Sequence, residues 1–205
     1  MPLGEYVAEN IFGPLGITQS AWKHSNDRLS SHFATLYNPP VNGQVALGRA
    51  GDSEIDWRLS ESERYSACPV GSQARTFDMG GSGLVGTAND YLIYSMMIAN
   101  LGEYNGTRVL SANSIETQTS QTVPTAIVSG LSGIPGRNLF GSGFGISLEQ
   151  DTDEPDYFSW GGSNSTGFFV DPKDGTVGVQ MSSCYRCRQA LIPDIEQIVD
   201  EARLD

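Results

Sequence analysis

The sequence is poor in the residues that metal, redox and disulfide sites require. It has two histidines and three cysteines among 205 residues, namely His24, His32, Cys68, Cys184 and Cys187. Three cysteines leave at least one unpaired, so no disulfide framework is expected. The C-x-x-C spacing of Cys184 and Cys187 suits redox chemistry or half of a zinc site, but no second such pair accompanies it. We interpret these cysteines as structural or incidental and expect no metal and no organic cofactor.

Basic residues are also scarce. Lysine occurs only as Lys23 and Lys173, and 24 acidic residues against 12 Lys and Arg give a net charge of −12. Without a basic cluster, neither nucleic acid nor an anionic membrane surface is an expected partner. A neutral or cationic small molecule fits better, and we interpret the acidic surface itself as a solvated face.

Long hydrophobic runs are missing as well. No apolar stretch approaches the length of a membrane span, and the residues after Met1 show no signal-peptide pattern. The compartment stays open, since a periplasmic or secreted parent protein is compatible with this sequence. A 39% hydrophobic content over 205 residues is enough for one core, so we expect residues 1–205 to form one domain or most of one.

Helical periodicity occurs in two segments of the first half. Leu3, Val7 and Ile11 form one stripe of a helix that the run 13–16 (Gly-Pro-Leu-Gly) should end. Residues 24–80 are rich in turn signals and predict little regular structure. Thr87-x-x-Asp90 resembles a capping box and opens an apolar segment that ends at Gly102, which predicts a buried helix. The methionines of that helix, Met96 and Met97, are interpreted as core.

From residue 140 the apolar period changes to two, which predicts strands. The alternating runs are 144–148, 158–160, 167–170 and 177–181. Asp171–Gly175 carries hairpin turn chemistry, and Ile192, Ile195, Val199 and Ala202 predict a final amphipathic helix. Successive strands closed by a helix predict an α+β fold, an antiparallel sheet flanked by helices.

Two short motifs resemble catalytic or binding signatures. Gly81-x-Gly83-x-x-Gly86 matches the dinucleotide fingerprint in letters, but no apolar strand precedes it. We interpret its glycines as allowing a close approach of loop and helix. Ser20-x-x-Lys23 matches the S-x-x-K pattern, in which a lysine accepts the serine proton, yet the run turns polar at once and suits a surface turn. We interpret it as a chance match.

The most informative segment is Trp160–Pro172, which reads WGGSNSTGFFVDP. It predicts a strand with two positions lacking side chains, followed by an apolar strand and a turn. Glycine within a strand marks the close approach of a ligand or of another backbone, and it also occurs at a β-bulge on a sheet edge. Both interpretations stand on the sequence alone.

Four blocks in order resemble the serine β-lactamase-like family, which includes class C β-lactamases, D-alanyl-D-alanine peptidases and family VIII esterases. Residues 6–22 resemble its "IF-x-PLGM-T" segment, and residues 80–90 its "GGGLVSTA-x-D" segment. Residues 100–111 resemble "NGG-x-x-NG-x-R-x-LS". Residues 144–145 and 160–172 resemble the "GFG" strand and the "WGG-x-x-GT-x-x-x-VDP" hairpin. At Ser165 the family usually has glycine.

The resemblance implies a β-lactamase/transpeptidase-like fold and assigns a substrate-binding strand to Trp160, Gly161, Gly162 and Ser163. The backbone N–H of Ser163 would be one oxyanion donor. The family's S-x-x-K and Y-x-N motifs precede the block at residues 6–22, so the nucleophilic serine, its lysine and the tyrosine are expected upstream of Met1. This chain is then expected to be the C-terminal portion of one hydrolase domain, with its N-terminal part missing.

The resulting function hypothesis is acyl-enzyme hydrolysis of a small-molecule ester, β-lactam or peptide carbonyl. Trp160 replaces the cationic residue that would meet a β-lactam carboxylate, which favours an ester. The alternative is a catalytically inactive fragment or a binding module derived from the family. In either case, a complementary N-terminal segment or self-association is an expected partner, because apolar surface would otherwise lack a cover.

Overall fold

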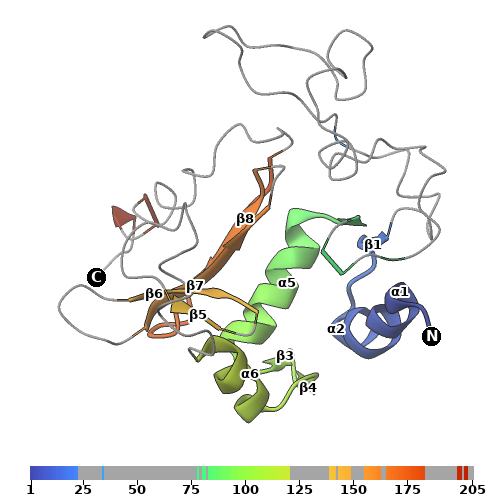
Figure 1. The fold of residues 1–205 in the computed structure, drawn as a ribbon, viewed down its shortest axis with the longest axis horizontal. Coiled ribbons are helices and arrows are strands. Elements are labelled where there is room, and N and C mark those ends of the chain that lie inside the picture. Colours follow the sequence, from blue (N-terminus) through green and yellow to red (C-terminus); the bar gives the residue numbers. More distant parts are fainter. Residues whose placement is uncertain are drawn as a thin grey trace, which may run out of the picture. The chain divides into compact units, whose positions relative to one another are not determined.

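The computed structural model describes residues 1–22, 34, 78, 80–81, 83–120, 139–141, 143–148, 155–162, 165–182, 198–199 and 201–202 (Figure 1). The chain forms two compact units. The first comprises Met1–Asp90, Gly162–Thr166 and Met181–Leu191, and the second comprises Tyr91–Gly161, Gly167–Gln180 and Ile192–Asp205. The predicted loop region 24–80 lies almost entirely outside the described residues.

The chain opens with a continuous helical segment. Helix α1 (Leu3–Val7) passes into the π-helix η1 (Ala8–Phe12) and then into α2 (Gly13–Leu15). The segment ends at Gly16, which adopts a φ of 71°. The amide of Ile17 bonds to the oxygen of Phe12 and the amide of Gly16 to that of Gly13, the pair of bonds that defines a Schellman motif. The predicted stop is therefore confirmed, and Gly16 is the residue that makes it.

A short ribbon follows this helix in the first unit. Strand β1 (Ala21–Trp22) pairs with β2 (Leu84–Val85) in antiparallel fashion, with Trp22 opposite Leu84. Leu15, Ile17 and Trp22 are buried and form the local core.

Helix α5 (Ala88–Ala99) confirms the predicted helix after Thr87. The Thr87 hydroxyl accepts the Asp90 amide at 3.1 Å, as a capping box requires. The helix stops at Ala99 and a turn reaches Gly102, whose φ of 93° suits glycine. Met97 is buried as predicted, whereas Met96 is 36% exposed, so the prediction that both methionines are core is wrong for Met96.

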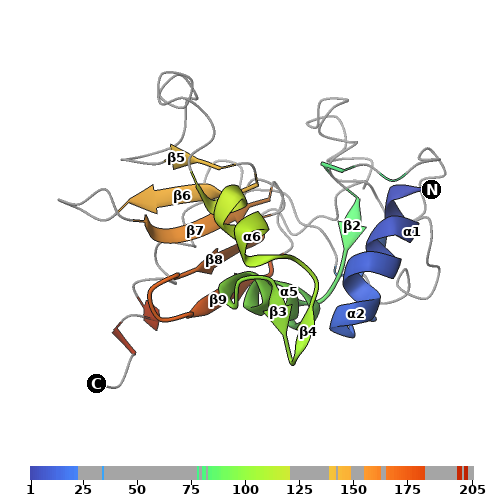
Figure 2. The ribbon, with the colours of Figure 1, turned by 90° about the horizontal axis from the view of Figure 1, so that it is seen from below.

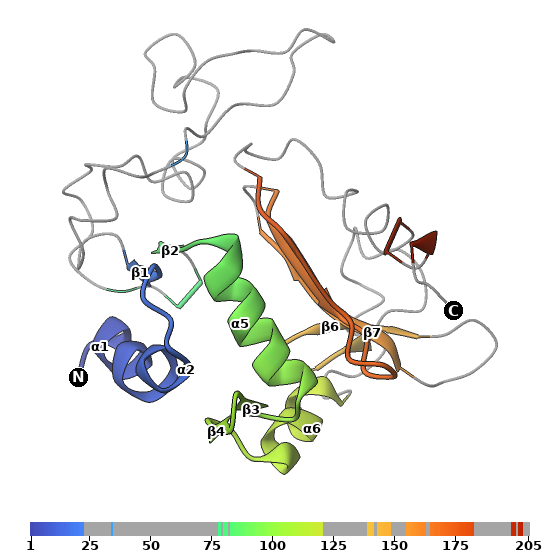
Figure 3. The same ribbon diagram turned by 180° about the vertical axis from the view of Figure 1, so that it is seen from behind.

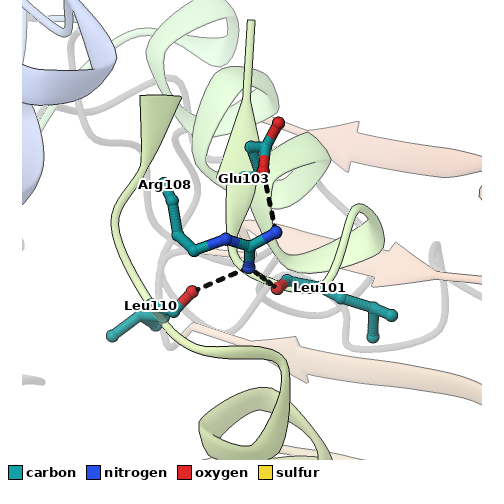
Figure 4. A network of polar contacts seen from close by, with 4 residues as sticks. All are labelled: Leu101, Glu103, Arg108 and Leu110. Carbon is teal, nitrogen blue, oxygen red and sulfur yellow. Dashed lines mark hydrogen bonds and ion pairs between the residues drawn. The ribbon is translucent and has the colours of Figure 1, made fainter. Parts of the chain in front are cut away.

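A hairpin and a short helix follow α5. Strands β3 (Glu103–Tyr104) and β4 (Thr107–Arg108) are joined by Asn105 and Gly106, whose φ values of 49° and 78° indicate the primed turn expected of an Asn-Gly pair. Arg108 closes this hairpin by bonding to Glu103 and to the main-chain oxygens of Leu101 and Leu110 (Figure 4). Helix α6 (Ala112–Thr119) then begins at Ser111, whose hydroxyl accepts the Ser114 amide.

The second unit contains a five-stranded sheet in the order β5-β6-β7-β8-β9 (Figure 2). Its strands are β5 (Leu139–Phe140), β6 (Gly145–Leu148), β7 (Pro155–Gly161), β8 (Gly167–Val170) and β9 (Val177–Gln180). Every neighbouring pair is antiparallel, so each strand pairs with the strand next to it along the chain. The predicted α+β fold with an antiparallel sheet flanked by helices is confirmed.

Strand β8 is buried along its whole length. Phe168 contacts Tyr91 of α5, with ring centroids 5.2 Å apart, and Phe144 at 5.8 Å. Phe169, which projects to the opposite face, lies against Gly178, where a Cβ would meet its ring at 2.0 Å. Both faces are therefore covered, and the buried-exposed alternation expected for this strand is absent. Figure 3 shows α5 running along the sheet.

The turn between β8 and β9 confirms the predicted hairpin. The Asp171 amide donates to the main-chain oxygen of Thr176. The Asp171 carboxylate accepts a hydrogen bond from the Lys173 amide at 2.8 Å. Gly175 has a φ of 75°. Of the predicted final helix, residues 198, 199, 201 and 202 are described, and the Ala202 amide bonds to the oxygen of Ile198 at 3.0 Å.

Candidate functional site

Trp160 and Gly161 form the end of strand β7. They pair with Phe168 and Gly167 of β8. On the other side, the ladder with β6 runs to the pair Gly145–Ser159. Gly161 is exposed and Trp160 is 50% exposed. This end of the strand is therefore exposed to solvent.

The indole of Trp160 lies beside Gly145. A Cβ added to Gly145 would meet the Trp160 ring at 3.9 Å and the main-chain oxygen of Ser159 at 3.2 Å. Position 145 is the second residue of the Phe144-Gly145 block, so the two blocks nearest the site are neighbours in the sheet. Any larger residue at 145 would press against the main chain of β7.

Gly162 begins the turn that joins β7 to β8. Its amide bonds to the oxygen of Thr166 at 2.8 Å, and the Ser165 amide bonds to the oxygen of Gly162 at 2.9 Å. A Cβ at position 162 would lie 2.5 Å from the Thr166 hydroxyl oxygen. The β7–β8 register is regular from 158 to 161, so the β-bulge interpretation finds no support there. Gly162 therefore packs closely against Thr166 of its own hairpin, whereas the main chain at Gly161 is exposed to solvent.

Ser163 lies outside the described residues. Its backbone N–H as an oxyanion donor therefore stays a prediction, as do the nucleophile, lysine and tyrosine expected upstream of Met1. Cys184, Cys187, His24 and His32 also lie outside the described part of the chain. Within that part, no cluster of three or more side chains suits a metal ion, and no helix is long and apolar enough to cross a membrane.

Ser20 is held in a separate network in the first unit. Its hydroxyl donates to Asp90 Oδ2 at 2.8 Å, and the Gln19 amide donates to the same oxygen at 2.8 Å. Ser20 precedes strand β1, so it is not at the start of a helix as S-x-x-K would require. Lys23 lies outside the described residues. The geometry supports the interpretation of Ser20-x-x-Lys23 as a chance match.

The glycines of Gly81-x-Gly83-x-x-Gly86 play different parts. Gly86 lies against Ser20, because a Cβ there would be 2.2 Å from the serine hydroxyl oxygen. Gly83 has a φ of 92°, and strand β2 lies between it and Gly86. Among the described residues, no atom lies within 4 Å of a Cβ added to Gly81. The prediction that these glycines allow a close approach of two segments is thus supported at Gly86. The segment that approaches Gly86 is the loop before β1.

An aromatic cluster in the second unit was not predicted from the sequence. Tyr91 contacts Tyr94 at 5.8 Å and Phe168 at 5.2 Å between ring centroids. Burial, with the neighbouring Tyr94 as the smaller cause, raises the pKa of Tyr91 far above its ordinary value. Burial also raises the pKa of Tyr94. The sequence places Tyr91 and Tyr94 three residues apart, on one face of a helix. It does not indicate that Tyr91 packs against Phe168 of strand β8, because that contact is distant in sequence.

Several solved structures share this fold. Simvastatin synthase (LovD) from Aspergillus terreus is 17% identical, covers 98% of this chain and 48% of its own, and superposes with a TM-score of 0.68. EstCE1, described as a hydrolase with promiscuous acyltransferase activity, is 20% identical over 94% of this chain and 49% of its own, with a TM-score of 0.67. A penicillin-binding protein homolog from Caulobacter crescentus is 18% identical over 90% and 47%, with a TM-score of 0.63. The fold is β-lactamase/transpeptidase-like.

The family follows from the sequence match. The Beta-lactamase family model matches residues 1–190, and the chain belongs to this family. A curated relative, Protein Rv1367c of Mycobacterium tuberculosis, is 28% identical over 186 residues. That match covers 83% of this chain and 41% of the relative, so the chain spans about two-fifths of the length of this relative. The resemblance to a serine hydrolase-like family is confirmed.

Proposed function

We propose that residues 160–163 form the substrate-binding strand of a serine hydrolase that works through an acyl-enzyme. The observation that supports this most directly is the exposed end of β7, where Trp160 is 50% exposed and Gly161 presents no side chain. The nucleophilic serine, its lysine and the tyrosine come from a segment that precedes residues 6–22. This chain is then the C-terminal portion of one domain, a view that agrees with its 41% coverage of the curated relative.

The chemistry assigned to this strand is electrostatic. The upstream serine attacks the substrate carbonyl, its proton passes to the neighbouring base, and negative charge develops on the carbonyl oxygen. The N–H of Ser163 and the N–H of the nucleophile itself stabilise that charge. The alcohol leaves with a proton, and water then cleaves the acyl-serine ester to release the acid. Gly161 suits this role because a side chain there would separate the substrate from the main chain of β7.

An ester is the favoured substrate. Trp160 offers an exposed aromatic surface where a cationic residue would favour a carboxylate-bearing β-lactam or peptide. One protein with this fold, EstCE1, is described as a hydrolase with promiscuous acyltransferase activity, which also suits acyl-transfer chemistry. Both points support an ester over a β-lactam or peptide carbonyl.

The second candidate function is a catalytically inactive fragment or binding module. The favouring observation is that Ser20, the serine of the S-x-x-K match, is hydrogen bonded to Asp90. Under this proposal, the exposed strand end still binds a small ligand or a complementary segment, but no acyl-enzyme forms.

One assay separates the two. The 205-residue chain, and the same chain extended by its in-frame upstream sequence, are incubated with a chromogenic ester and a chromogenic cephalosporin. We expect turnover by the extended protein alone, faster on the ester, and unchanged by Ser20→Ala. Trp160→Ala should raise KM about tenfold, the value of a lost aromatic contact. Tyr6→Ala, which removes another half-exposed aromatic side chain, is the matched control.

Turnover by the 205-residue chain that is lost in Ser20→Ala would refute the upstream-serine proposal. Absence of turnover in both proteins would favour the binding module.

A further inference from the structure

Ser165 has an unusual main-chain conformation for a residue with a side chain. Its φ is 61°, in the left-handed region, and it is only 5% exposed. A side chain makes this conformation costly, so it persists only where the surroundings enforce it. Ser165 lies in the turn after Trp160–Gly162, so the contacts that hold its conformation also affect the proposed site.

One contact made by Ser165 comes from beyond strand β9. The Ser182 hydroxyl donates to the main-chain oxygen of Ser165, across seventeen positions of sequence. Both residues belong to the first unit, so the contact lies within one compact body. A donor attached to a different segment fixes the direction of the Ser165 carbonyl, and thereby the peptide plane that follows it.

The rest of the turn is closed from within. The Gly162 amide bonds to the oxygen of Thr166, and the Ser165 amide bonds to the oxygen of Gly162. The Thr166 hydroxyl lies close to Gly162, where a Cβ would be 2.5 Å away. These contacts link the turn's two ends, and the Ser182 hydroxyl reaches the turn from a distant part of the chain.

We propose that Ser182 is a positioning residue for the substrate-binding strand: it holds the left-handed main chain of Ser165 in the conformation that suits acyl transfer. This inference rests on the proposed function. The Ser182 hydroxyl touches no reacting atom and takes no proton from the reaction. It acts on catalysis through the main chain of Ser165, and its effect should fall on kcat, because the turn matters when charge develops on the carbonyl oxygen.

The test compares Ser182→Ala with Ser120→Ala. Ser120 is a matched control because its hydroxyl also donates to a main-chain oxygen, that of Glu116, on an exposed helix end in the other unit. Hydrogen exchange of the peptide containing Gly162 and Ser165 is measured by mass spectrometry in the 205-residue chain. We expect exchange there to become about tenfold faster in Ser182→Ala, the size of one lost hydrogen bond, and to be unchanged in Ser120→Ala. Equal exchange rates in the two variants would show that the Ser182 hydroxyl does not hold the turn, and would overturn the proposal.

Catalysis is measured separately in the protein extended by its upstream sequence. Ser182→Ala should lower kcat for the chromogenic ester about tenfold with little change in KM, and Ser182→Thr, which keeps the hydroxyl, should restore most of the loss. An unaltered kcat in Ser182→Ala overturns the positioning role while the proposed function stands. If the unaltered extended protein hydrolyses no ester, the proposed function fails, and the catalytic role of Ser182 fails with it, whatever the exchange result shows about the tether.

Discussion

Ser20 donates its hydroxyl to the carboxylate of Asp90 at 2.8 Å across seventy positions of sequence. Asp90 is 4% exposed and accepts the Gln19 amide through the same oxygen. The start of helix α5 is thereby joined to the residues that lead into strand β1. Since a buried carboxylate is costly unless it is hydrogen bonded, these two donors explain how Asp90 is tolerated in the interior.

Removing the Asp90 carboxylate should destabilise the protein strongly. Asp90→Ala leaves the Ser20 hydroxyl and the Gln19 amide without their acceptor, and we expect it to lower the free energy of unfolding by about 2–3 kcal/mol. Asp90→Asn keeps an acceptor without the charge and should cost less. Urea denaturation followed by circular dichroism measures both, and an Asp90→Ala variant as stable as the parent would contradict the network.

The contact between Gly86 and Ser20 predicts a compensating pair of substitutions. Gly86→Ala places a Cβ 2.2 Å from the Ser20 hydroxyl oxygen. We expect a loss of about 1–3 kcal/mol from overpacking. In the double variant with Ser20→Ala the nearest atom is the Ser20 Cβ at 3.1 Å, so part of this loss should be recovered. The coupling is read from a double-mutant cycle of unfolding free energies, and strict additivity would exclude the contact.

Arg108 and Leu101 should affect stability in opposite directions. The Arg108 guanidinium bonds to the oxygen of Leu101 at 2.9 Å and to Glu103 at 2.7 Å (Figure 4). Because these side chains are about half exposed, Arg108→Ala should cost only about 1 kcal/mol. Leu101 has a φ of 52° and stands where the family motif has glycine, so Leu101→Gly should be neutral or stabilising by up to about 1 kcal/mol. Thermal unfolding measures both, with Glu103→Gln as the control for the ion pair alone.

Ser165 should tolerate glycine and reject a β-branched residue. Its φ of 61° is open to glycine at no steric cost, whereas valine is a severe outlier there. Ser165→Gly should change the free energy of unfolding by less than about 1 kcal/mol, and Ser165→Val should lower it by more than about 2 kcal/mol. If chemical denaturation finds the two variants equally stable, the left-handed conformation is not maintained in solution.

Tyr91 should make the protein less stable in alkali. Burial raises its pKa above the ordinary value of about 10, so only the unfolded chain releases this proton as the pH rises past that value. The stabilisation is therefore full below about pH 10 and declines above it. Tyr91→Phe keeps the ring packed on Phe168 and removes the titration, so it should flatten the decline. Unfolding free energies between about pH 8 and 11 provide the test, and an unchanged slope in Tyr91→Phe would contradict it.

Local chemistry made several elements predictable. Thr87 caps α5 and Asp171–Gly175 closes the last hairpin, because each depends on residues only a few positions apart. The α+β arrangement followed from the change of apolar period near residue 140. Family resemblance predicted that Trp160 and Gly161 line a site, and the structure shows that this end of the strand is exposed.

The features that were not predicted depend on contacts between residues far apart in the sequence. Asp90 resembled the second half of a capping box, yet its carboxylate bonds to residues 19 and 20. Met96 shares the apolar composition of its helix but faces outward, which depends on how the helix is packed. Ser165 gave no sign of its left-handed φ except that glycine is usual there, and its anchor at Ser182 depends on the completed hairpins.

The sheet of the second unit is a plain meander in which spatial order repeats chain order. Each pairing closes a loop only between neighbouring strands, so the entropy cost of assembling the sheet is paid in small successive steps. The β8–β9 hairpin, whose turn is held by Asp171, is the pairing most able to form early. The five described strands can therefore pair in the order in which they are synthesised, which limits the time that their unpaired edges are open to aggregation.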